Sequence, residues 1–188
     1  MTLFGYLKLF IFFIILIPIL YLPVFLVLKK KGNGIIRQSS HLFFLWSLFI
    51  IVFFTIILFN LPFDMHPRRH VLNLWPLKWL WERNVTRRLF REISPNIVLF
   101  IPLGFFLPTA FKHMRKIQMT ALVSFTVTFC VEFFQYFIGR ASDVDDLIAN
   151  LSGSLIGYGL YKLSDYLFKN ERWWQKITGA SNSSYSKN

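Results

Sequence analysis

The sequence is poor in cysteine and in acidic residues. Its single cysteine, Cys130, excludes an intramolecular disulfide and a zinc site built from a cysteine cluster. Nine Asp and Glu residues stand against 21 Lys and Arg residues, which gives a formal net charge of +12. No motif that combines basic and aromatic residues indicates nucleic-acid binding, so we expect no nucleic-acid partner. In a membrane protein, such an excess of Lys and Arg reports topology and contact with anionic lipids.

Hydrophobic residues make up 55% of the 188 residues, and the mean hydropathy is +0.49. These values predict an all-α membrane protein, because a helix pairs its own backbone polar groups within lipid. We expect a bundle of about five transmembrane helices, over residues 9–28, 42–63, 97–111, 117–139 and 147–168. The third is short and contains Pro102, so it is either a continuous helix or a re-entrant one. Residues 1–170 would form one transmembrane domain, and residues 171–188 a partly disordered cytoplasmic tail.

The basic residues of the short connections predict the orientation. Clusters of Lys and Arg follow the first, third and fifth expected spans, and such clusters favour the cytoplasmic side. We therefore expect the N-terminus outside and the C-terminus in the cytoplasm. The 63–95 segment would then lie outside, although it also carries several basic residues.

The segment between the second and third spans has an amphipathic pattern. Over residues 75–93, apolar residues recur at helical spacing and most arginines lie off that stripe, which predicts an interfacial amphipathic helix. The alternative is a loop packed over the spans. The residues expected to contact lipid at the interface are Trp79, Arg83, Arg87, Arg88 and Arg91.

Polar residues gather near the outer ends of the last three expected spans. Glu132 is costly in hydrocarbon, so it must pair, face water or hold its proton. Asp143 and Asp145 have a simpler alternative role, since acids are common at the start of a helix. We expect one outward-facing polar pocket formed by Asn73, Asn96, Glu132, Gln135, Arg140, Asp143, Asp145, Asp146 and Asn150.

Small residues indicate where helices approach one another closely. Ala149, Gly153 and Gly157 are spaced by four along the fifth span, and Gly104 lies in the third. Such a row lets another helix pack tightly. Because it lies beside Asp146 and Asn150, these two polar residues should point into the bundle.

Three sequence blocks, in this order, resemble the VanZ-like family of bacterial membrane proteins. The first is NLWP at residues 73–76, and the second is NIVLFIPLGFFLP at residues 96–108. The third, over residues 132–157, runs Glu-x-x-Gln, Arg, Asp-x-Asp-Asp and Asn-x-x-Gly. Together they cover about residues 73–159. The resemblance implies a multi-pass protein of the bacterial plasma membrane, linked in some members to resistance to glycopeptides such as teicoplanin, which has a lipid tail.

Three functions remain open. The favoured one is non-enzymatic binding of a membrane lipid, a lipid-linked cell-wall precursor or a lipoglycopeptide at the outward-facing pocket. The second is an intramembrane enzyme in which Glu132 is a general acid or base and Asp143 and Asp146 hold a divalent cation. Outside that hypothesis we expect no metal or cofactor. The third is a proton-coupled transporter, which the small number of spans and the lack of an inverted repeat disfavour. The sequence carries no signal for an oligomeric state.

Overall fold

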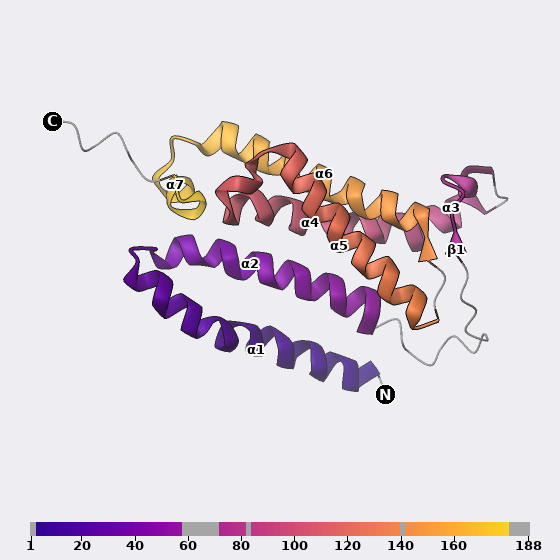
Figure 1. Ribbon diagram of the computed structural model, residues 1–188, viewed down its shortest axis with the longest axis horizontal. Helices are drawn as coiled ribbons and strands as arrows, with labels where there is room; N and C mark the ends of the chain where they lie inside the picture. The colour runs from indigo at the N-terminus through magenta and orange to yellow at the C-terminus, as the bar shows by residue number, and fades with distance from the viewer. Residues whose placement is uncertain (1–2, 58–71, 82–83, 140–141, 181–188) are drawn as a thin grey trace.

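The computed structural model describes residues 3–57, 72–81, 84–139 and 142–180. Its long helices lie along one another and give the molecule an elongated shape (Figure 1). These helices are α1 (Leu3–Lys30), α2 (Ile35–Val52), α4 (Ser94–Ala110), α5 (Ile117–Phe137) and α6 (Val144–Phe168). The strand β1 (Leu72–Asn73) and the short helix α3 (Val85–Arg88) lie at one end, and the short helix α7 (Arg172–Thr178) lies at the other (Figure 1). We call these two ends the strand end and the α7 end.

Within the described residues, four helical stretches are long and apolar enough to cross a membrane. They are Phe4–Lys30, Ile35–Ile57, Val85–Ala110 and Ile117–Phe137. The second includes the π-helical turn η1 (Phe53–Ile57), which continues α2. These stretches overlap the first four expected spans, so the chain is an all-α, multi-pass membrane protein. The helix α1 packs on α2 and leaves many apolar side chains exposed, as suits a surface that faces lipid.

The helix α6 covers the fifth expected span. Its 25 residues extend over about 37 Å, which is long enough to cross a membrane. It is less apolar than the other four stretches because it carries acids in its first turn and several Gly and Ser residues. It packs against α4 and α5. Neighbouring helices therefore cover the polar face of α6, as a helix of this composition requires in lipid.

The third span is one continuous helix, neither short nor re-entrant. Val85–Ala110 runs for 26 residues through α3, the π-helical turn η4 (Leu89–Ile93) and α4. Ser94 and Pro95 resemble a helix start in the sequence, but the helix passes through them. The wide turn η4 ends two residues before Pro95, and such a turn accommodates a residue that has no N–H to donate.

The interfacial helix expected over residues 75–93 is therefore divided. Its first part is a 3₁₀ turn, η3 (Lys78–Trp81), which contains Trp79. Its second part is the beginning of the third span. Arg83 lies outside the described residues.

The two sides of α5 differ, and the difference places Glu132 inside the bundle. Thr120, Ser124 and Thr128 are spaced by four and fully buried, and Glu132 continues the row with 5% of its surface exposed. Exposed phenylalanines form another row whose neighbouring rings contact one another, namely Phe125, Phe129, Phe133 and Phe137. The small hydroxyl residues thus face other helices, and the aromatic rings face outward.

The helix α7 lies within the segment expected to be a tail. Its Trp174 is 3% exposed, and the indole N–H donates to Asp165 of α6 at 2.8 Å. The Trp174 ring also packs near Tyr161, with ring centroids 6.1 Å apart. The described part of this segment is therefore folded against the bundle, whereas residues 181–188 lie outside the described residues.

Helices α4 and α6 cross at very close range. A Cβ atom on Gly104 would lie 1.9 Å from a backbone carbonyl oxygen of α6. A Cβ on Gly153 would lie 2.1 Å from the carbonyl oxygen of Ile97, and Gly157 makes a third such approach. Ala149, in the same row, is buried. Side chains larger than hydrogen at the three glycines would force the two helices apart.

The close crossing predicts that Gly153→Ala lowers the stability of the protein. The added methyl group overpacks the interface, which costs about 1–3 kcal/mol. Thermal unfolding in detergent measures the effect. The matched control is Gly159→Ala on the same helix, where a Cβ has nothing within 4 Å. Equal unfolding temperatures for the two variants would show that the crossing is not tight.

Candidate functional site

A two-stranded parallel sheet organises the strand end. Leu72 and Asn73 of β1 pair with Ser142 and Asp143 of β2 (Ser142–Asp143), respectively. This pairing fixes the segment before the third span to the connection between α5 and α6. It brings residues from distant parts of the sequence to the start of α6.

Asp143 lies at the centre of the polar groups at this end. Its carboxylate caps α6 by accepting a hydrogen bond from the backbone N–H of Asp145 at 3.0 Å. It also accepts from the side-chain amide of Asn73 at 3.0 and 3.1 Å. Arg88 completes the cluster, because its Nη2 lies 2.5 Å from Oδ2 of Asp143. Capping is therefore only one role of the Asp143 carboxylate, which also contacts Asn73 and Arg88.

Asp145 is 2% exposed and is tied to two other segments. Its Oδ1 accepts from the backbone N–H of Leu77 at 2.5 Å, and its Oδ2 lies 3.6 Å from Nη2 of Arg88. Leu77 has φ of +58°, a left-handed conformation that is unfavourable for a branched side chain. The hydrogen bond to Asp145 helps to hold the backbone in that conformation.

Asp146 and Asn96 connect the starts of α6 and α4. The amide of Asn96 donates to Asp146 Oδ1 at 2.8 Å. Both residues belong to the pocket expected from the sequence. Their contact joins two helices that also cross at the glycines.

Glu132 reaches the same connection from α5. Its Oε2 accepts from the Ser142 hydroxyl at 3.0 Å and from the backbone N–H of Asp143 at 3.2 Å. Glu132 and Ser142 also line a groove of about 350 Å³, whose other walls are mostly apolar. Its walls come from the strand segment, α5 and the start of α6: Leu72, Leu74, Phe129, Phe133, Tyr136, Phe137, Asp143, Val144 and Leu147. A buried carboxylate thus lies at a hydrophobic groove.

Two expected pocket residues join helices instead. Gln135 donates to the backbone carbonyl of Thr55, in the last turn of the second span, at 3.1 Å. Asn150 donates to the hydroxyl of Thr128 on α5 at 2.7 Å. Neither lines the groove beside Glu132. Arg140 lies outside the described residues.

The structure separates the arginines that the sequence groups together. Arg88, expected to contact lipid, instead pairs with Asp143 and Asp145, and its side chain is only 16% exposed. Arg87 and Arg91 are exposed and line a shallow depression on the surface. The pattern over residues 75–93 shows a basic face, but it does not indicate which arginine meets an acid. The sequence also carries no indication that Ser142 and the backbone N–H of Leu77 contact the acids of this site, because a two-residue strand pairing has no periodic signal.

Two other arginines support the α7 end. Arg37 donates to the carbonyl oxygens of Thr109, Ala110 and Ile177, at 2.5–2.9 Å. Arg115 donates to the carbonyl oxygen of Thr178 at 2.5 Å. Basic side chains are favourable at helix C-termini, where carbonyl groups lack partners within the helix. The sequence marks these arginines only as topology signals.

Among the described residues, no three His, Cys, Asp or Glu side chains are grouped to hold a metal ion. Asp143 and Asp146, the expected cation ligands of an enzyme, each accept from a nitrogen donor of another segment. The geometry therefore gives these two acids a role in joining segments.

Fold and site together define a multi-pass helical membrane protein with a network of acids at one end. Comparison with protein families matches residues 42–168 to the VanZ/LLP1 family, and the chain belongs to that family. The chain is similar to protein VanZ of Enterococcus faecium, with 32% identity over 128 residues. That match covers 64% of this chain and 73% of the relative. No solved structure gives a significant match.

The site geometry predicts that Arg88→Gln destabilises the strand end. The change leaves two largely buried carboxylates without their arginine, and breaking a buried ion pair costs about 3 kcal/mol. Thermal unfolding and proteolysis of the connection between α5 and α6 measure the loss. Arg91→Gln is the matched control, since it removes the same charge from an exposed position one turn away. Similar stability of the two variants would contradict a structural role for the Arg88 pairs.

Proposed function

We propose that this protein acts in the bacterial plasma membrane by binding a ligand with a lipid tail at the strand end. The candidate ligands are an envelope lipid, a lipid-linked cell-wall precursor and a lipoglycopeptide such as teicoplanin. The acyl tail would lie in the groove beside Glu132, and polar groups of the ligand would meet the strand-end network. Resistance to such an antibiotic would follow from binding, without any reaction.

The observation that carries this proposal is the groove itself. Its volume of about 350 Å³ is at the lower end of the range for small-molecule sites. Phe129, Phe133 and Phe137 on one wall are each at least half exposed, so an acyl chain can enter sideways from the lipid. The groove also contains the carboxylate of Glu132 and the hydroxyl of Ser142, which gives a tailed ligand an apolar and a polar contact at once.

The proposed orientation places the strand end outside the cell. Basic residues gather at the α7 end, in the connections after α1, α4 and α6. Such a distribution favours the cytoplasm. Exposed Arg87 and Arg91 at the strand end would then meet phosphate groups of the outer leaflet or of a lipid-linked precursor.

Filling the groove tests tail binding. We expect Leu147→Trp to weaken binding of teicoplanin to the detergent-purified protein by about tenfold, because loss of about two buried methylene groups costs roughly 1.4 kcal/mol. Titration calorimetry or fluorescence anisotropy measures the affinity. Leu163→Trp is the matched control, since Leu163 is an exposed residue of the same helix outside the groove.

A glycopeptide with the same core but no acyl chain provides a second comparison. Its binding should be weak and equal for both tryptophan variants. Equal affinity of the two variants for teicoplanin and for a lipid-linked precursor would contradict a role of the groove in binding.

A second candidate is an intramembrane enzyme that acts on an envelope lipid or polymer. The hydrogen bond from Ser142 to Glu132 favours it, because a hydroxyl beside a carboxylate can act as an activated nucleophile. Glu132 would accept the hydroxyl proton while the Ser142 oxygen attacks the ester carbonyl of the bound lipid. The acyl–oxygen bond of the lipid would then break, with Glu132 returning the proton to the departing alcohol, and water would hydrolyse the acyl-serine. Binding is the simpler function, since it requires only the groove and its polar residues.

Turnover distinguishes the two functions. If the protein is an enzyme, incubation with envelope lipids yields a changed lipid by mass spectrometry, and Glu132→Gln and Ser142→Ala each abolish it. Ser152→Ala is the control, since the hydroxyl of this half-buried α6 serine donates to Ile148 of its own helix. If the protein only binds, no changed lipid forms with the unaltered protein.

A further inference from the structure

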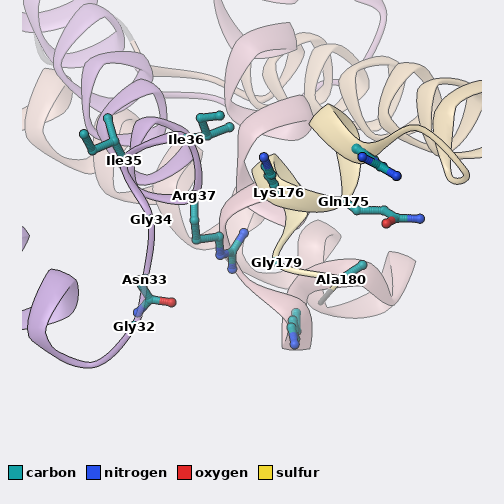
Figure 2. A pocket seen from close by; sticks show the side chains of 12 residues that line it. Gly32, Asn33, Gly34, Ile35, Ile36, Arg37, Gln175, Lys176, Gly179 and Ala180 are labelled. Carbon is teal, nitrogen blue, oxygen red and sulfur yellow. The ribbon is translucent and has the colours of Figure 1, made fainter. Parts of the chain in front are cut away.

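A basic pocket opens at the α7 end, far along the bundle from the strand-end network. It lies between the connection of α1 with α2, the start of α2, and α7 with the turn that follows it. Figure 2 shows Arg37 projecting between the loop of Gly32 and Gly34 on one side and Gly179 on the other. The pocket has a volume of about 960 Å³ and opens onto the surface of the protein.

Four cationic side chains line this pocket, namely Arg37, Lys112, Arg172 and Lys176, and no described acidic residue lines it. None of the four forms an ion pair with a carboxylate in the described part of the chain. Concentrating four like charges around one hollow is unfavourable unless an anion or solvent compensates them. The charge pattern therefore fits an anionic ligand.

Arg37 provides a fixed charge at the inner side of the pocket. Its guanidinium is held by three backbone carbonyl oxygens, from the last turns of α4 and α7. These contacts use three of the five N–H donors of the side chain, so two remain unused within the described residues. The other three cations are exposed and can adjust to a bound group. One rigid donor surrounded by mobile ones suits a phosphate, which accepts hydrogen bonds from several directions.

The pocket also lies where headgroups are expected. It is next to the end of α1 and the start of α2, where two candidate spans end. Trp173 of α7 is 45% exposed, and Trp is enriched at the boundary between lipid and water. A phosphate in this pocket can therefore belong to a lipid.

We propose that the basic pocket at the α7 end binds a phosphate group, as carried by an anionic lipid headgroup or by a soluble phosphate ester. The site is separate from the groove beside Glu132 and does not depend on the function proposed for that groove. On the orientation given above, it faces the cytoplasmic leaflet.

The test compares two triple variants of the full-length protein in detergent. The pocket variant is Lys112→Gln, Arg172→Gln and Lys176→Gln, which leaves Arg37 to hold the helix ends. The control variant is Lys29→Gln, Lys30→Gln and Lys31→Gln, which removes the same charge from exposed positions near the same end but outside the pocket. Native mass spectrometry measures binding of phosphatidylglycerol, phosphatidylcholine and glycerol 1-phosphate.

We expect the unaltered protein to prefer phosphatidylglycerol to phosphatidylcholine. The pocket variant should bind phosphatidylglycerol at least tenfold more weakly, and the control variant should stay within threefold of the unaltered protein. The same pattern with glycerol 1-phosphate but not with phosphatidylglycerol would support the phosphate site and assign it a soluble ligand. An equal loss in both variants, or no loss in either, would overturn the proposal.

Discussion

The contact of Arg88 with Asp143 and Asp145 is the interaction on which the strand end depends. The chain has few acids, and it places three of them within the first turn of α6 or at its cap. Such a concentration of negative charge beside a hydrophobic bundle needs a cation and hydrogen-bond donors. Arg88 supplies the cation from the beginning of the third span, while Asn73 and the backbone of Leu77 supply donors from the segment before it.

This network also explains why Glu132 can lie inside the bundle. Its carboxylate accepts hydrogen bonds from the Ser142 hydroxyl and from the backbone N–H of Asp143. Both donors belong to β2, which the network holds in place. One wall of the groove beside Glu132 is therefore a backbone segment with a fixed position. At the α7 end, Arg37 and Arg115 likewise satisfy polar groups of the backbone, because they donate to carbonyl oxygens in the last turns of α4 and α7.

The sequence predicts much of the fold because apolar length and small-residue spacing are strong signals. The spans and the row of Gly153 and Gly157 can be read from it directly. The continuity of the third span cannot be read from the sequence, because Ser94 and Pro95 have the features of a helix start. The structure shows that the helix runs through them after a π-helical turn. The polar residues could be grouped by position, but their partners could not. Gln135 and Asn150 contact residues of other helices that no local pattern identifies.

The π-helical turn η4 sets the direction in which Arg88 points. Such a turn holds one residue more than an ordinary helical turn, and each residue of an α-helix advances the chain by about 100° around the axis. The wide turn therefore absorbs one residue without rotating the helix before it. If the same residues were wound as an ordinary α-helix, everything upstream would rotate by roughly that angle, and Arg88 would point away from the start of α6. The winding of this one turn, and not only residue identity, thus determines the placement of the arginine.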